Sequence, residues 1–137
     1  MINLALELIK RFEGCRLAPY VCPAGRWTCG WGSTGIDVIP GQAWTQPYAD
    51  YRLEQDAIKA SLDAVRLCPG LTGTQIDAIA DFVYNLGSGR LRSSTLRRKF
   101  NAGRIDEAKT ELMKWVFGGG KKLLGLVLRR KAEADLL

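Results

Sequence analysis

The segment Glu13-Gly14-Cys15-Arg16-Leu17-Ala18-Pro19-Tyr20-Val21-Cys22-Pro23-Ala24-Gly25-Arg26-Trp27-Thr28 joins a helical pattern to an extended one, and it decides the fold of this chain. Before it, Ile2, Leu6 and Ile9 recur at helical spacing, which predicts a helix over residues 2–13. Continuing the phase by four residues places Glu13 on the same apolar face, and the glycine that follows is a suitable helix stop. A carboxylate is therefore expected at the partly buried end of a helix, where it can act as a proton donor.

After the helix the sequence changes to short extended runs. Aromatic and β-branched residues flank the turn-forming Pro23-Ala24-Gly25, which predicts a small hairpin between Leu17 and Cys29. Glycines at 30, 32, 35 and 41 then indicate a loop-rich crossing. Within the hairpin, Cys22 and Thr28 follow Glu13 at short intervals and complete a candidate catalytic triplet.

The absence of histidine excludes several classes of enzyme. The 137 residues contain no histidine, which rules out Ser/His/Asp and Cys/His nucleophile arrangements and zinc sites that need imidazole ligands. If the chain is a hydrolase, carboxylates must carry the proton. An alternative role for Glu13 is an ion pair with an arginine, such as Arg16 or one from the basic carboxyl-terminal part.

Length and composition predict one domain over residues 1–137. No stretch approaches the roughly 20 apolar residues that span a membrane, and the amino terminus lacks the pattern of a signal peptide. We therefore expect a protein made in the cytoplasm. Residues 1–89 carry 7 basic and 9 acidic side chains, whereas residues 90–137 carry 13 and 5, so net charges of −2 and +8 divide the chain. The basic part favours polyanions, either non-specifically or by steering a substrate.

Four cysteines, at 15, 22, 29 and 68, are expected to be reduced thiols without a metal, because their spacing does not match close zinc-binding pairs. Cys22 lies seven residues from both Cys15 and Cys29, so a regulatory disulfide is one hypothesis. The alternative is that Cys15 and Cys29 are buried apolar residues. No cofactor is expected.

The remaining chain is predicted to be mostly helical. Pro47 in a first turn, capped by Thr45 or Gln46, begins a long helix to about Leu67 that links two lobes. Its apolar positions at helical spacing are Tyr51, Ile58, Leu62 and Val65. Further helices are predicted from a Thr72–Gln75 capping box to Gly87, from Ser93 or Ser94 to Asn101, and from Asp106 to Trp115. The glycines at 118–120 suggest a flexible break, and residues 123–137 a packed closing helix whose Arg129-Arg130-Lys131 run forms a solvated face.

Taken in order, these motifs resemble those of the phage-type, T4-like lysozymes or endolysins, glycoside hydrolase family 24. The resemblance covers nearly the whole chain and rests on the ordered set rather than on one piece. Its residues are Glu13-Gly14, Leu17, Tyr20, Cys22, Thr28, Gly30-x-Gly32, Phe82-Val83-Tyr84-Asn85-Leu86-Gly87, Ser94-Thr95-Leu96, Trp115, Gly119-Gly120-Lys121, Gly125-Leu126 and Arg129-Arg130.

The resemblance implies an α+β, mainly α, lysozyme-like fold: a small lobe with a β-hairpin, a larger helical lobe and a long helix joining them. It implies catalytic roles for Glu13 as acid and for Cys22 and Thr28 in handling water. Cys22 departs from the usual aspartate: its thiolate could act as a base, stabilise positive charge on the sugar or attack the sugar, or Cys22 could be a small apolar replacement without a catalytic role. Ser33 replaces a frequent histidine. The family pattern also suggests that Ser33, Tyr84, Asn85 and Thr95 line a substrate cleft, although Tyr84 is equally well explained as a core aromatic.

The implied activity is hydrolysis of the β-1,4 bond between N-acetylmuramic acid and N-acetylglucosamine in peptidoglycan, for host-cell lysis. A lytic transglycosylase, which needs no external water, is the first alternative because Cys22 is not a carboxylate. An inactive wall-binding or nucleic-acid-binding module is the second, although no specific nucleic-acid signature supports it. The expected enzyme is a monomer that meets the glycan strand after a holin-type membrane lesion.

Overall fold

The first helix ends at the predicted residue. The computed structural model describes residues 3–137, and α1 spans Asn3–Glu13. Ala5, Leu8 and Ile9 are buried on it, whereas Ile2 lies outside the described residues. The phase that ran from Ile9 to Glu13 is confirmed, because Ile9 is fully buried and the Glu13 side chain is 23% exposed.

The predicted hairpin follows directly. Strands β1 (Arg16–Val21) and β2 (Trp27–Gly30) pair antiparallel, with Tyr20 opposite Thr28 and a turn over the residues between Val21 and Trp27. Cys29 points into a small core with Val38, Trp44 and Ala49. Gly30 has a φ of +65°, and a Cβ there would lie 3.0 Å from the Trp44 ring, so this close packing requires glycine. This small core anchors the hairpin to the start of the next helix.

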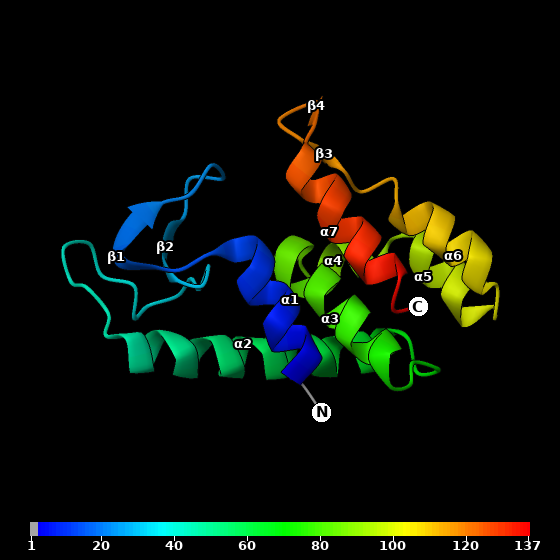
Figure 1. Ribbon diagram of the computed structural model, residues 1–137, viewed down its shortest axis with the longest axis horizontal. Helices are drawn as coiled ribbons and strands as arrows, with labels where there is room; N and C mark the ends of the chain where they lie inside the picture. Colours follow the sequence, from blue (N-terminus) through cyan, green and yellow to red (C-terminus); the bar gives the residue numbers. More distant parts are fainter. Residues whose placement is uncertain (1–2) are drawn as a thin grey trace.

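Helix α2 (Gln46–Leu67) is the long connection between the lobes, and it runs along the base of the molecule in Figure 1. Thr45 caps it by accepting a hydrogen bond from the Tyr48 amide at 3.3 Å, and Pro47 lies in its first turn, as predicted.

The buried face of α2 is not the one that its larger apolar residues indicated. Tyr51, Ile58, Leu62 and Val65 are all exposed, with Leu62 at 66%. Leu53 and Leu67 are buried together with four alanines, at 49, 57, 60 and 64. Alanine lets helix backbones approach closely, and α2 packs against α3 along this small-residue face. The prediction was wrong because it followed the large apolar side chains, whereas the buried face of α2 consists mostly of alanines.

The larger lobe contains five helices and a short second hairpin. Its elements are α3 (Thr74–Leu86), α4 (Ser88–Arg92), α5 (Thr95–Asn101), α6 (Ile105–Leu112), β3 (Phe117–Gly118), β4 (Lys121–Lys122) and α7 (Leu124–Ala134). Ser94 caps α5, accepting from the Arg97 amide at 3.0 Å, as predicted. The Thr72–Gln75 capping box forms only in part: Gln75 accepts from the Thr72 amide, but Gly73 is the N-cap. Helix α4 was not predicted, and the expected break at residues 118–120 is the turn of the second hairpin.

On the closing helix α7, the buried and exposed residues are the reverse of those expected. Arg129 is 3% exposed and Arg130 is fully buried, so the prediction of a solvated basic face was wrong for both. Leu124 and Leu128 are instead 72% and 46% exposed. Both guanidinium groups are buried because they pair with buried carboxylates, Arg129 with Asp81 and Arg130 with Glu133.

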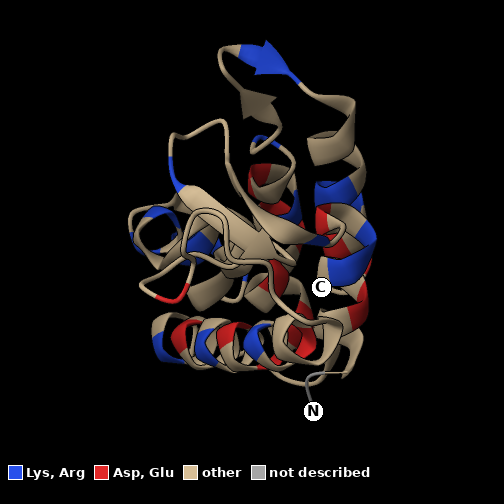
Figure 2. Cartoon of the chain, turned by 90° about the vertical axis from the view of Figure 1, so that its left-hand side faces the viewer, with Lys and Arg blue, Asp and Glu red and all other residues tan. Residues whose placement is uncertain are grey.

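The resulting arrangement confirms the predicted mainly helical α+β fold, with a hairpin lobe and a helical lobe joined by α2 (Figure 1). In Figure 2 the short β4, which consists of two exposed lysines, projects at the top of the molecule. None of the helices within residues 3–137 combines the length and apolarity needed to cross a membrane.

Candidate active site

Glu13 is held at the end of α1 by an arginine from α7. Its Oε2 atom accepts a hydrogen bond from Nη1 of Arg129 at 2.6 Å. The other two nitrogens of that guanidinium donate to Asp81 on α3, Nε to Oδ2 at 2.9 Å and Nη2 to Oδ1 at 2.8 Å. The ion pair considered from the sequence therefore exists, with Arg129 rather than Arg16. Because Asp81 fixes Arg129 by two bonds, Arg129 fixes the direction of the Glu13 carboxylate.

The second oxygen of Glu13 faces a glycine. A Cβ on Gly32 would lie 3.0 Å from Oε1 of Glu13 and 3.8 Å from the Tyr84 ring, and Gly32 has a φ of +94°. Glycine thus leaves space beside the oxygen that Arg129 does not bind. Oε1 is therefore the oxygen of Glu13 that faces this space.

The buried charge network behind Glu13 includes a pair of carboxyl groups, those of Asp81 and Glu133. Burial raises the pKa of Glu133 well above its usual range, and its hydrogen bond with Asp81 raises it further. Burial also acts to raise the pKa of Asp81, but hydrogen bonds from Glu133 and Arg129 outweigh it and lower that pKa. The two shifts run in opposite directions, so Asp81 is the group of the pair that ionises more readily, and it pairs with Arg129 at 2.8 Å.

Arg130 plays a parallel part for Asn85. Its Nη2 atom donates to Oδ1 of Asn85 at 2.7 Å and to Oε2 of Glu133 at 3.0 Å. Neighbouring arginines of α7 thus position two residues of the predicted cleft, Arg129 for Glu13 and Arg130 for Asn85. The basic run contributes to the site from within the core.

Ser33, Asp56 and Tyr84 form a polar cluster on the hairpin side of α2. The Ser33 hydroxyl donates to Oδ2 of Asp56 at 2.6 Å, and the Tyr84 hydroxyl donates to the Trp31 carbonyl at 2.7 Å. Burial, followed by the charges of Asp56 and Glu13, raises the pKa of Tyr84, so its hydroxyl stays protonated. The Tyr84 ring packs against two core clusters, as expected for a core aromatic, and the residue also lines the first hollow. Its contact with substrate stays a prediction.

Cys22 and Thr28 lie together at the tip of the hairpin. The backbone N–H of Arg26, then the Thr28 hydroxyl, lower the pKa of the partly exposed Cys22 thiol, since both favour the thiolate. Thr28 is 4% exposed, and its hydroxyl has a single proton, which it can donate either to the Cys22 sulfur or to the Arg26 carbonyl at 2.9 Å. The turn thus presents a thiol whose anion is stabilised by its own backbone.

The other cysteines lie apart from this thiol. Cys29 is buried on the core side of β2, where burial raises its pKa and its Sγ approaches the Leu17 carbonyl at 3.2 Å. All four cysteines are free thiols. The alternative that Cys15 and Cys29 are buried apolar residues holds for Cys29, whereas Cys15 is only partly buried. Within residues 3–137 no group of histidine, cysteine or carboxylate side chains is arranged to hold a metal ion.

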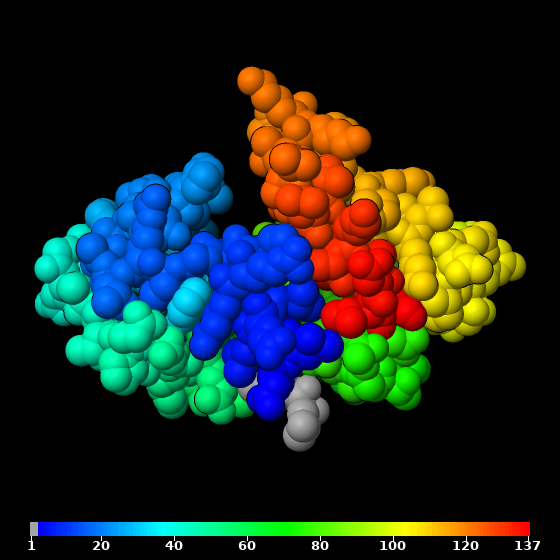
Figure 3. All heavy atoms as spheres, in the orientation of Figure 1, coloured from blue at the N-terminus to red at the C-terminus, as the bar shows by residue number. Residues whose placement is uncertain are grey.

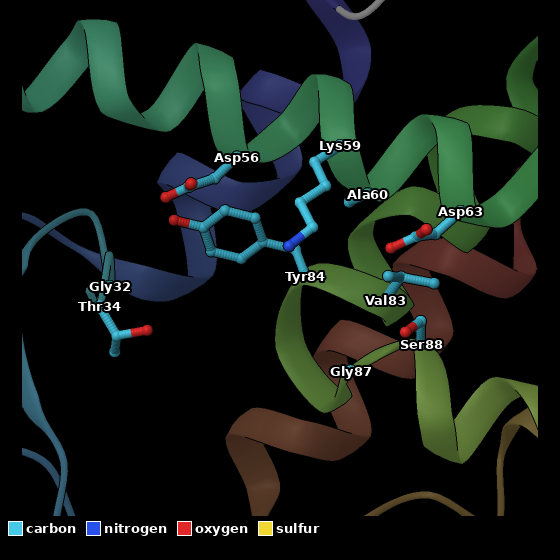
Figure 4. Close-up of a pocket in the computed structure, with 10 residues that line it drawn as sticks. All are labelled: Gly32, Thr34, Asp56, Lys59, Ala60, Asp63, Val83, Tyr84, Gly87 and Ser88. Atoms are coloured by element: carbon cyan, nitrogen blue, oxygen red, sulfur yellow. The ribbon is translucent and has the colours of Figure 1, made fainter. Parts of the chain in front are cut away.

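Two hollows border Glu13 and its neighbours. The first, of about 370 Å³, is lined mainly by α2, α3 and the loop after β2, including Gly32, Asp56 and Tyr84 (Figure 4). The second, of about 380 Å³, is lined by Glu13 and Asn85 together with Phe12, Leu123, Gly125, Leu126 and Arg129. Figure 3 shows a notch between the hairpin lobe and the tip formed by the second hairpin and the start of α7. The cleft therefore has recesses in which Glu13 and Tyr84 are wall residues.

The predicted site residues thus fall into three groups. Tyr84 lines the first hollow, and Glu13 and Asn85 line the second. Ser33 is buried and lines neither, but it donates to Asp56 in the wall of the first. Cys22 with Thr28 forms the hairpin tip. Thr95 joins neither, since it lines neither hollow and accepts a hydrogen bond from Arg98 of its own helix at 2.8 Å.

Asp56 and Asp81 are the site residues that the sequence analysis did not single out. A signal existed for Asp81: it lies within the apolar run Ile76–Val83, where a carboxylate needs a buried partner. Asp56 carried no comparable signal, because it lies among the polar positions of α2.

Comparison with known proteins agrees with this geometry. The family model described as phage lysozyme matches residues 10–133. An endolysin of Acyrthosiphon pisum secondary endosymbiont phage 1 is 42% identical, with 96% of this chain and 92% of the relative covered. An endolysin of Bacillus phage B103 is 40% identical over 96% of this chain, which spans 51% of that longer protein.

Among solved structures, the muramidase domain of SpmX from Asticaccaulis excentricus superposes with a TM-score of 0.89 and 32% identity, covering 99% of this chain and 96% of that one. The sequence match extends from before Glu13 to Glu133 and so includes every residue of the site described above. This chain belongs to the phage lysozyme family, a family of peptidoglycan-cleaving glycosidases.

Proposed function

We propose that this protein is a muramidase endolysin that hydrolyses the β-1,4 bond between N-acetylmuramic acid and N-acetylglucosamine in bacterial peptidoglycan. The observation that carries the proposal is the Glu13 carboxylate, with Oε2 bound by Arg129 and Oε1 directed at the open space over Gly32. A chain without histidine needs such a carboxylate to protonate a leaving oxygen. Residues 1–137 act in this proposal as one catalytic domain.

The glycan strand occupies the two hollows on either side of Glu13. Tyr84 and Asp56 contribute to the first wall, where the buried Ser33 hydroxyl donates to Asp56, and Asn85 contributes to the second. These groups suit a sugar, since hydroxyls and an amide offer hydrogen bonds beside apolar surface. We retain Thr95 only as a weaker candidate for contact with a longer strand.

In the proposed reaction, Oε1 of Glu13 donates its proton to the glycosidic oxygen as the bond to the anomeric carbon breaks. Water adds to that carbon from the opposite face, and Cys22 in its thiolate form accepts a proton from this water, while Thr28 helps to orient it. The lowered pKa of Cys22 supports the role of base. Proton transfer from the thiol back to Glu13 through solvent restores the starting state.

A lytic transglycosylase is the second candidate, and Cys22 is the observation that favours it. That chemistry uses an acid/base such as Glu13, but the muramic acid 6-hydroxyl replaces water. Mass spectrometry of digested peptidoglycan separates the two. Muramic acid at a free reducing end supports hydrolysis, whereas a 1,6-anhydro-muramic acid product contradicts it.

We also propose that the enzyme acts as a monomer, accumulates in the host cytoplasm and reaches periplasmic peptidoglycan through a holin-type lesion. Expression of the chain alone in a Gram-negative host should leave growth intact until the inner membrane is permeabilised. Rapid lysis without permeabilisation would contradict this part of the proposal.

A further inference from the structure

The first hollow contains one cation that no carboxylate neutralises. Lys59 projects from α2 into the wall between Asp56 and Asp63, and Figure 4 shows all three side chains on the side that faces Tyr84 and Ser88. Among residues 3–137, no ion pair includes the Lys59 ammonium group. Its position on the helix would allow pairing with either neighbour, since they lie three and four residues away.

Both of those carboxylates are engaged elsewhere. Asp56 accepts from the Ser33 hydroxyl at 2.6 Å and lies 3.5 Å from Nη2 of Arg52. Asp63 lies 3.1 Å from Nη2 of Arg66. The charges that would otherwise hold Lys59 to the helix surface are thus partly offset by arginines. The ammonium group remains available to an anion in the hollow.

A glycan of N-acetylglucosamine alone has no anion to offer this lysine. Muramic acid differs from it by the 3-O-lactyl group, which is either a free carboxylate or the attachment point of a peptide that carries carboxylates. We propose that Lys59 is a specificity-determining residue that pairs with a carboxylate on the lactyl side of muramic acid. This inference rests on the proposed function, because it assigns one contact of the same substrate.

Such a contact affects substrate binding more than chemistry. Lys59 is exposed and belongs to the wall of an open hollow, so the pair is screened by solvent and salt. Its loss should raise KM by about two- to fivefold at low ionic strength and leave kcat unchanged. The effect should shrink as salt is added.

The experiment compares Lys59→Met and Lys59→Arg with wild type. Lys109→Met is the matched control, because it removes the same charge from α6, which lies at the far side of the helical lobe from the hairpin (Figure 1). Three substrates are used: sacculi with stem peptides, amidase-treated strands with free lactyl carboxylates, and the same strands with these carboxylates converted to methylamides. Reducing ends are measured over a range of substrate concentrations.

The inference predicts a raised KM for Lys59→Met on at least one carboxylate-bearing substrate, a normal KM on the methylamide strands, and near-normal behaviour of Lys59→Arg and Lys109→Met. An effect confined to sacculi places the carboxylate in the stem peptide, and one on amidase-treated strands places it on the lactyl group. Equal KM values for wild type and Lys59→Met on all substrates that are cleaved would overturn the inference alone. Failure of wild type to release any reducing end would instead overturn the proposed function.

Discussion

The two sides of the proposed reaction are built in opposite ways. Glu13 is fixed by a network in which Arg129, Asp81 and Glu133 are almost completely buried. Cys22 lies in a partly exposed turn, where the Arg26 amide and the Thr28 hydroxyl are the groups that stabilise its thiolate. The acid is therefore positioned by the core of the helical lobe, and the thiol by local backbone geometry.

Because of this difference, substitutions at the two places should affect stability and activity differently. A change behind Glu13 disturbs buried charges and should affect folding together with activity. A change at Cys22 alters an exposed turn and should affect activity almost alone. Substitutions on each side of the proposed reaction can test this contrast.

Replacing the proposed acid should have the largest effect on activity. Glu13→Gln keeps a group that can accept from Arg129 but removes the acidic proton, so cleavage should fall by about 10³-fold. The measurement is clearing of outer-membrane-stripped Gram-negative cells, with reducing-end release as a second readout. Glu7→Gln, at an exposed position of the same helix, is the control and should retain activity. Unchanged clearing by Glu13→Gln would revive the reading of the chain as a binding module.

Removing the buried guanidinium should have the largest effect on stability. Arg129→Met leaves the Asp81 charge buried without its partner, which should cost about 3–5 kcal/mol in the free energy of unfolding. Activity should also fall, because Oε2 of Glu13 loses its hydrogen bond. Urea denaturation provides the measurement. Adding Asp81→Asn to Arg129→Met should recover part of the stability but not the activity, and strictly additive losses would refute the coupling.

Cys22→Ser should lower activity by about 10²-fold without loss of stability, as expected for loss of a general base. The pKa of Cys22 is lowered, so wild-type activity should rise with pH as the thiolate forms, with a midpoint below the ordinary range of a thiol. Cys22→Ser should lose this rise, because a serine hydroxyl does not ionise there. Cys22→Asp should be active and should lack this rise, since its carboxylate is already ionised at these pH values. A pH profile of Cys22→Ser that matches wild type would remove the thiol from the mechanism.

The space beside Glu13 should be sensitive to a single methyl group. Gly32→Ala places a Cβ at 3.0 Å from Oε1 in a backbone conformation with positive φ, and about tenfold of activity should be lost, equivalent to about 1.4 kcal/mol. Gly41→Ala is the matched control, since its φ is +84° but its Cβ would meet nothing within 4 Å. Both variants should be destabilised by about 1 kcal/mol, but only Gly32→Ala should lose activity. Equal activities would show that contact with Glu13 is unimportant.

The same contrast explains what could be predicted from the sequence. Local signals located the helix that ends at Glu13, the hairpin and the Ser94 cap, because helical phase and capping act over a few neighbouring residues. The role of Arg129 depends on Asp81, which lies 48 residues away, so a basic run at the end of the chain was taken for a solvated face. The face of α2 was misjudged for a related reason, since its burial is decided by how closely α3 can approach.

In the proposed mechanism, a water molecule that Cys22 deprotonates and Thr28 orients attacks the sugar from the side opposite Glu13. The most direct test is cleavage in H₂¹⁸O, with the first-formed anomer followed by proton NMR and the ¹⁸O position by mass spectrometry. This mechanism predicts ¹⁸O at the muramic acid reducing end and an initial α-anomer, which is the inverted product of a β-linkage. An initial β-anomer, or a product without ¹⁸O, would contradict it.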